Sequence, residues 1–192
     1  MLLKDIKIGF ALTGSFCTFG KVFPEIEKIV AEGAGVYPII SGAVDKLDTR
    51  FGKAEEFKLR LEGITGKNVI STVIEAEPIG PKALLDVLVI APCTGNSLSK
   101  IANAINDTSV TMAVKAHLRN GKPTVIAVST NDGLGINARN IGILLTMKNI
   151  YFVPFGQDDP IKKCNSLVAK MEMIIPTILE AMQGRQIQPI LV

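Results

Sequence analysis

Short, nearly continuous apolar runs alternate with longer amphipathic segments along the whole chain. The apolar runs are typical of buried β-strands, and we expect strands at residues 6–12, 36–40, 86–91, 124–128 and 150–155. The amphipathic segments predict helices at residues 23–32, 48–61, 97–104, 108–119, 137–147 and 166–182. Residues 63–82 remain ambiguous, with a short strand expected near 69–72 and an irregular Pro-Gly-Pro loop after it. Pro38 predicts either a less central place in the sheet or an irregularity for the second strand.

This alternation predicts an α/β fold in three layers, a Rossmann-like or flavodoxin-like parallel sheet with helices on both faces. The chain has 192 residues, of which 47% are apolar and 20% charged, so it is long enough for one sizeable core. We find no repeat, linker or low-complexity tract. Residues 1–192 are therefore expected to form a single domain.

Composition argues against several classes of partner. The net charge is only +3, Trp is absent and aromatic residues make up 5%, which disfavours nucleic-acid binding. No run approaches the roughly 20 apolar residues of a membrane span, and no signal peptide is evident. The three cysteines are far apart, which argues against a disulfide framework and against a metal site. We expect a soluble cytoplasmic protein with no membrane partner.

The segments that follow the predicted strands are rich in hydroxyls, amides and glycine. Because ligands of open α/β sheets bind outside the carboxyl ends of the strands, these loops are the candidate site. Short donors and backbone N–H groups there suit a phosphate, although turns and helix caps favour the same residue types. There is no G-x-G-x-x-G or P-loop motif, so a mononucleotide fits better than a dinucleotide or nucleoside triphosphate. The candidate residues are Gly14, Ser15, Phe16, Ser41, Cys93, Thr94, Gly95, Asn96 and Ser129.

Few other side chains suggest chemistry. His117, the single histidine, falls within a predicted helix, so we expect it to be structural or on the surface rather than a catalytic base. Cys17 and Cys93 lie in loops at the carboxyl edge and are expected to have inert thiols. Lys82 and Arg139 are candidate anchors for a carboxylated substrate, with solvated surface charge as the alternative.

Three motifs resemble the flavoprotein family of flavin-containing cysteine decarboxylases and flavin prenyltransferases. They are Thr-Gly-Ser at 13–15, Ala-Pro-Cys-Thr-Gly-Asn at 91–96 and Lys-Ile-Ala-Asn-Ala-Ile at 100–105, with Ser41 in addition. The resemblance implies FMN as cofactor, Gly14, Ser15 and Phe16 in a flavin-contacting loop, and Ser41 at the phosphate. It also implies that residues 93–96 lie beside the ribityl chain and ring, and that the chain forms homo-oligomers, as trimers or dodecamers.

The chain departs from the family pattern where the decarboxylases and prenyltransferases carry catalytic groups. Pro78 stands where the decarboxylases have a histidine, and Ser129 stands where the prenyltransferases hold the cofactor with an arginine, which lowers the expected affinity for FMN. The decarboxylase substrate clamp becomes Ser-Thr-Asn-Asp at 129–132, and Cys164 is the one counterpart of a flap cysteine. A flavin prenyltransferase or phosphopantothenoylcysteine-decarboxylase-like activity therefore ranks last.

Within the family, the chain resembles a branch whose members are the B subunit of a two-subunit oxidoreductase. The resemblance lies in residues 78–82, 93–107, 129–135 and 155–160. That resemblance implies a different chain as partner, the A subunit of the same enzyme. It also implies a small dicarboxylate substrate and a role in the mother cell of a sporulating bacterium. Any NAD(P) would have to be bound by the partner, because the dinucleotide fingerprint is missing here. The alternative is a non-catalytic scaffold that keeps the flavoprotein fold and activates the A subunit.

Overall fold

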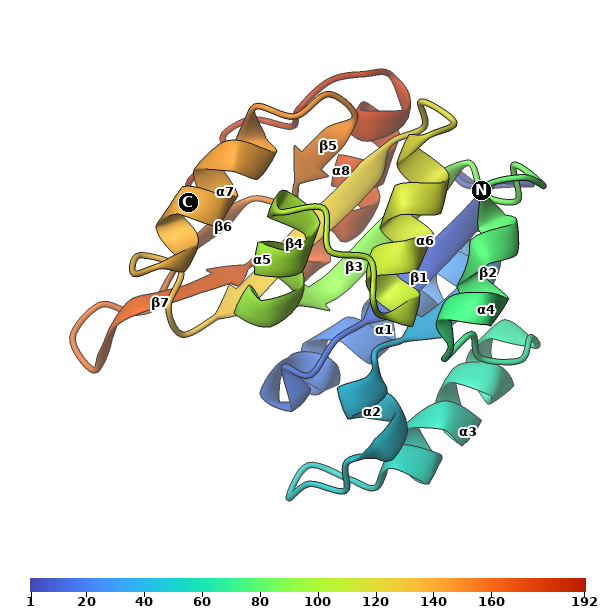
Figure 1. The fold of residues 1–192 in the computed structure, drawn as a ribbon, viewed down its shortest axis with the longest axis horizontal. Helices are drawn as coiled ribbons and strands as arrows, with labels where there is room; N and C mark the ends of the chain where they lie inside the picture. The colour runs from blue at the N-terminus through green and yellow to red at the C-terminus, as the bar shows by residue number, and fades with distance from the viewer.

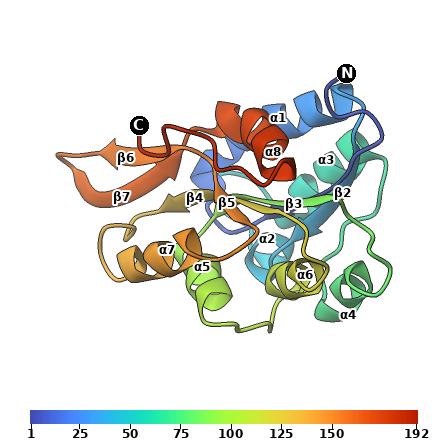
Figure 2. The ribbon, with the colours of Figure 1, turned by 90° about the horizontal axis from the view of Figure 1, so that it is seen from above.

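The computed structural model describes residues 1–192, which form a seven-stranded sheet between two layers of helices (Figure 1). The strands are β1 (Lys7–Leu12), β2 (Gly35–Ile40), β3 (Val87–Cys93), β4 (Thr124–Thr130), β5 (Ile150–Phe152), β6 (Phe155–Asp159) and β7 (Lys163–Ala169). The α-helices are α1 (Phe19–Ala31), α2 (Gly42–Lys46), α3 (Ala54–Thr65), α4 (Val73–Ala76), α5 (Gly95–Ala102), α6 (Ser109–Leu118), α7 (Asn137–Leu145) and α8 (Ile174–Met182). Helices α1 and α8 cover one face of the sheet, and α5, α6 and α7 cover the other (Figure 2). None of the helices is both long and apolar enough to cross a bilayer.

Strands β1 to β5 form a parallel sheet in the order β2-β1-β3-β4-β5, which confirms the predicted fold class. Strand β1 pairs with β2 on one side and β3 on the other, so the direction of winding reverses between β1 and β3. This reversal opens a crevice at the carboxyl edge, where ligands of doubly wound sheets bind. The loops after β1 and β3 meet at this point.

The core accounts for the patterns seen in the sequence. All seven residues of β3 are buried, as expected for a central strand covered by helices on both faces. A single cluster of 48 buried apolar residues runs through both layers. Strand β2 lies at the edge of the sheet, the first of the two outcomes that its proline predicted, and the Pro38 carbonyl accepts a hydrogen bond from the Ile70 N–H at 2.9 Å. The expected strand near residues 69–72 is reduced to an isolated bridge between Ile39 and Ile70.

The helix predicted from residue 48 begins six residues later, at Ala54. Residues 48–53 form a tight turn with a bridge between Thr49 and Gly52, and Gly52 has a φ of +146° that favours glycine. Asp48 still satisfies the start of the helix, because its Oδ1 accepts a hydrogen bond from the Ala54 N–H at 2.9 Å. The N-cap of α3 is Lys53 rather than Asp48, so both the expected helix start and the expected capping residue were wrong, although Asp48 contacts the first N–H of the helix.

The helix predicted over residues 166–182 was also wrong in its first part. Residues 166–169 belong to β7, which forms an antiparallel hairpin with β6, and the helix is confined to α8. Strand β7 also pairs with the end of β4, where Ser129 lies opposite Val168, so the sheet is mixed rather than wholly parallel. The hairpin projects beyond the carboxyl edge of the sheet (Figures 1 and 2). It thereby supplies a wall to the crevice.

The C-terminal tail lies along the hairpin. The Phe155 N–H donates to the Ile190 carbonyl at 3.0 Å, and the Val192 N–H donates to the Phe155 carbonyl at 3.1 Å. Gly156 fits there because a side chain would collide with the Val192 carbonyl. The tail is thus held against β6 rather than frayed.

Candidate functional site

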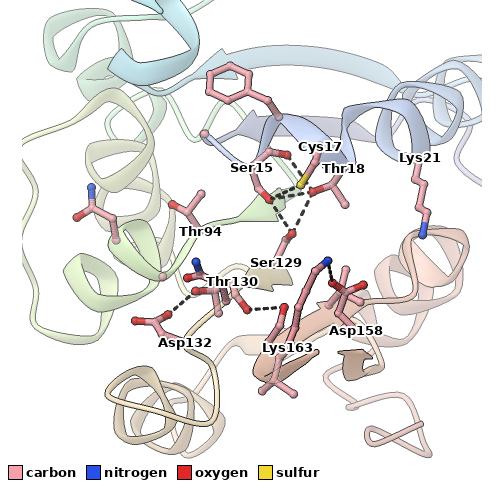
Figure 3. Close-up of a pocket in the computed structure, with 18 of the residues that line it drawn as sticks. Ser15, Cys17, Thr18, Lys21, Thr94, Ser129, Thr130, Asp132, Asp158 and Lys163 are labelled. Atoms are coloured by element: carbon pink, nitrogen blue, oxygen red, sulfur yellow. Dashed lines mark hydrogen bonds and ion pairs between the residues drawn. The ribbon is translucent and has the colours of Figure 1, made fainter. Parts of the chain in front are cut away.

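A cavity of about 670 Å³ opens at the carboxyl edge of the sheet (Figure 3). Its floor is made by the loops that follow β1, β3 and β4, and one wall is the β6–β7 hairpin. This volume lies within the range of sites for cofactors and other small molecules. The lining residues are Gly14, Ser15, Phe16, Cys17, Thr18, Lys21, Phe51, Thr94, Gly95, Asn96, Ser129, Thr130, Asn131, Asp132, Asp158, Lys163, Ser166, Leu167 and Val168.

Seven of the nine residues that the sequence suggested for cofactor binding line this cavity. They are Gly14, Ser15, Phe16, Thr94, Gly95, Asn96 and Ser129. Ser41 and Cys93 are buried and do not line the cavity. The Ser41 N–H donates to the Leu12 carbonyl at 3.0 Å, while the Ser41 hydroxyl has no hydrogen-bond partner. Burial raises the pKa of Cys93 to about 12, which keeps its thiol protonated and unreactive. From this buried position Cys93 does not contact a ligand in the cavity.

Thr13 connects the two loops that meet at the winding reversal. Its hydroxyl donates to the Pro92 carbonyl at 2.7 Å and accepts from the Thr94 N–H at 2.9 Å. The Thr13 N–H also donates to the Pro92 carbonyl, at 3.3 Å. These bonds bring the ends of β1 and β3 together and place Thr94 at the N-cap of α5. The sequence marked Thr13 as a loop residue, but nothing in it revealed this bridging role.

Three hydroxyls form a closed cluster between the first loop and β4. The Oγ atoms of Ser15 and Ser129 are 2.8 Å apart, and the Thr18 Oγ1 lies 2.9 Å from Ser15 Oγ and 3.0 Å from Ser129 Oγ. Thr18 also donates to the Ser15 carbonyl at 2.9 Å. A hydroxyl can turn to donate or accept, so these groups can exchange a bond within the cluster for one to an anionic ligand. Thr18 lines the cavity but was not predicted from the sequence.

The opposite side of the cavity carries a hydrogen-bonded carboxylate. Asp132 Oδ1 accepts from the Thr130 hydroxyl, and Oδ2 accepts from the Asn137 amide at 2.8 Å. The buried Asn140 amide in turn donates to Asn137 at 2.8 Å. Gly95 packs against this network so closely that a Cβ would lie 2.5–2.7 Å from three of its polar atoms. The network therefore fixes both the direction of the Asp132 carboxylate and the start of α5.

Two lysines and an aspartate add charge near the hairpin. Lys163 on β7 forms an ion pair with Asp158 on β6, and Lys21 extends from α1 toward the same wall (Figure 3). The hydrogen bond and charge of Asp158 raise the pKa of Lys163 above its ordinary value. These three residues were not predicted from the sequence, because their proximity depends on a hairpin that the local pattern does not reveal.

The lysine and arginine that the sequence suggested as substrate anchors do not line the cavity. Lys82 precedes β3, so it lies at the amino edge of the sheet, away from the carboxyl edge. Arg139 lies exposed on α7. Neither position suits an anchor for a ligand bound in this cavity.

His117 is buried in α6, and its Nε2 lies 2.9 Å from the Pro123 carbonyl. Burial lowers the pKa of His117 to about 4. The expectation that it is structural is confirmed.

The doubly wound sheet with a polar cavity at the winding reversal is typical of α/β proteins that bind ligands at the carboxyl edge of the sheet. The chain belongs to the Flavoprotein family, whose model matches residues 2–185. It is 53% identical over 190 residues to the B subunit of dipicolinate synthase from Bacillus subtilis (strain 168), a match that covers 99% of this chain and 95% of that relative.

Solved structures agree with this family assignment. The crystal structure of the dipicolinate synthase B subunit from Bacillus halodurans C has a TM-score of 0.92 and 49% identity, with 100% of this chain and 98% of that chain covered. The FMN-dependent cysteine decarboxylase SpaF has a TM-score of 0.68 at 21% identity, with 95% and 99% covered. The decarboxylase is similar in fold alone.

Proposed function

We propose that this chain is one of the two subunits of a dipicolinate synthase and that it works with the A subunit of that enzyme. The complex would form dipicolinate, pyridine-2,6-dicarboxylate, from dihydrodipicolinate during sporulation in the mother-cell cytoplasm. The single observation that carries the proposal is the cavity at the carboxyl edge, which gathers seven of the nine predicted flavin-contacting residues in a chain 53% identical to a named B subunit.

The donors around the cavity fit FMN or another phosphate-bearing ligand. The hydroxyls of Ser15, Thr18 and Ser129 offer neutral hydrogen-bond donors. Helix α5 begins at Gly95 on the cavity wall, so its first N–H groups add partial positive charge. A bound flavin would supply a two-electron acceptor, and any NAD(P) would be bound by the A subunit. Ser129 offers no charge-assisted hydrogen bond, so we expect modest affinity.

The residues of this chain would orient the substrate and take up a proton. Conversion of the dihydropyridine ring to pyridine removes a hydride and a proton, and aromatisation drives the change. Of the two carboxylates in the cavity, Asp158 is paired with Lys163, whereas Asp132 has no ion-pair partner. We therefore assign Asp132 to accept the proton on a carboxylate oxygen. Thr130 and Asn137 hold this carboxylate in place.

The test compares the isolated A subunit, this chain by itself and the complex, by flavin absorbance and dipicolinate formation. Ser15→Leu and Asn96→Leu fill the cavity and should abolish flavin binding and the activity of the complex. Ser71→Leu, in the loop before α4, is the control and should leave both unchanged. Full activity of the isolated A subunit would refute the proposal.

The second candidate function is a non-catalytic scaffold that activates the A subunit. Pro78 at the position of the decarboxylase histidine, and Ser129 at that of the prenyltransferase arginine, favour it. The cavity-filling variants separate the two functions, since a scaffold would keep the activity of the complex after Ser15→Leu. Self-association as a trimer or dodecamer belongs to either proposal and is measured by light scattering.

A further inference from the structure

The charges of the cavity are divided between two sides. Lys21 and Lys163 lie with Asp158 on the side of α1 and the hairpin, whereas Asp132 lies on the side of α5 and α7 (Figure 3). No ion pair involves Lys21, and Lys163 is paired only with Asp158. The hairpin side thus carries a net positive charge, and the opposite side carries a negative charge. An anionic ligand is attracted to the first and repelled by the second.

The two ammonium groups come from separate elements. Lys21 is in the first turn of α1, and Lys163 is the first residue of β7. In Figure 3 the Lys163 side chain rises from the hairpin toward the loop that holds Cys17 and Thr18, and Lys21 extends from α1 toward the hairpin. A ligand on this wall would meet positive charge from both elements.

We propose that Lys21 and Lys163 bind the two carboxylates of a small aromatic dicarboxylate, an inference that rests on the proposed function and names the residues that recognise its substrate and product. The two carboxylates of a pyridine-2,6-dicarboxylate are attached to separate carbons on either side of the ring nitrogen, so each can accept hydrogen bonds from its own ammonium group. Asp158 pairs with Lys163 when no ligand is present, and therefore competes with one carboxylate. Repulsion by Asp132 favours the orientation in which both carboxylates face the lysines.

The experiment measures binding of dipicolinate and of picolinate, which has a single carboxylate, to the full chain with and without FMN by calorimetry. Lys21→Gln and Lys163→Gln should each weaken dipicolinate binding about three- to fivefold, the size typical of one solvent-exposed ion pair. Each should also reduce the preference for dipicolinate over picolinate. Lys163→Arg keeps the charge and should retain most of the affinity. Asp158→Asn should tighten binding, because it removes the competing carboxylate.

Lys162→Gln is the matched control, because Lys162 is adjacent in the hairpin and does not line the cavity. It should leave both affinities unchanged. Three results would overturn the inference. They are equal effects of Lys162→Gln and Lys163→Gln, no binding of dipicolinate at millimolar concentration, and weaker dipicolinate binding by Asp158→Asn. The proposed function is tested separately: it would be contradicted if FMN failed to bind or if the isolated A subunit were fully active. The inference is decided by the dipicolinate affinities of the lysine variants, whichever of those results is found.

Discussion

Gly95 makes a sharp test of the polar network beside the cavity. The substitution Gly95→Ala adds one methyl group, whose carbon would lie 2.5 Å from Asn137 Nδ2, 2.6 Å from Thr130 Oγ1 and 2.7 Å from Asp132 Oδ1. All three atoms take part in the hydrogen bonds that hold the Asp132 carboxylate. None can stay in place, because real Cβ contacts are not shorter than 3.0 Å.

The expected cost is the difference between two effects. Overpacking costs about 1–3 kcal/mol, and alanine in a helix recovers about 0.5–1 kcal/mol relative to glycine. Gly95→Ala should therefore lower the free energy of unfolding by about 1 kcal/mol, near the middle of a range of about 0–2.5 kcal/mol. Gly142→Ala on α7 is the control, because nothing lies within 4 Å of its added carbon. It should raise the free energy of unfolding by about 0.5–1 kcal/mol.

Urea unfolding followed by circular dichroism, at one protein concentration, measures both variants. For a slope of about 2 kcal/mol/M, the midpoint should fall by about 0.5 M for Gly95→Ala and rise for Gly142→Ala. Flavin titration should show weaker binding only for Gly95→Ala, because the added methyl displaces the cavity wall. Equal midpoints for the two variants would refute the reasoning that Gly95 is required by close approach.

Three further measurements test individual residues. The pKa of His117 lies near 4 in the folded protein, against 6.5 for an unperturbed histidine, so its contribution to stability is full above about pH 6.5 and declines as the pH falls toward 4. The free energy of unfolding should fall by about 3 kcal/mol over this pH range. In urea titrations at several pH values, His117→Gln should remove most of this pH dependence. An unchanged pH dependence in the variant would contradict a lowered pKa of His117. A chromogenic disulfide reagent should modify the exposed Cys17 and Cys164 in the native protein and reach the buried Cys93 only on unfolding, so rapid reaction of three thiols would contradict the buried position. FMN should slow the reaction of Cys17, which lines the cavity, and leave that of Cys164 unchanged.

The residues that line the cavity at the strand ends were predictable, because their position follows from the order of elements along the chain. The loops after β1, β3 and β4 must share one edge of a parallel sheet, and Ser15, Asn96 and Ser129 do line one cavity. The same rule places Lys82 away from the cavity, because Lys82 precedes β3 and so lies at the amino edge of the sheet. The strand predicted at residues 86–91 was already enough to show that Lys82 cannot lie at the carboxyl edge.

The hairpin could not be predicted from local pattern. The segment Ser-Leu-Val-Ala at 166–169 suits either a helix or a strand, and pairing of Val168 with Gly156 and Ser129 decides for the strand. Asp158 and Lys163 lie on this hairpin and line the cavity, and neither was predicted from the sequence to do so.

Periodicity, proline placement and chain order were enough to predict the alternation of strands and helices, the parallel core, the less central position of β2 and the loops that line the cavity. These are local properties, and they can be read without knowing which distant residues meet. Which side chains face the cavity depended on the folded chain. Folding turned Cys93 into the core, joined Ser15, Thr18 and Ser129, and placed Lys163 on the wall of the cavity, because these outcomes depend on contacts between residues distant in sequence.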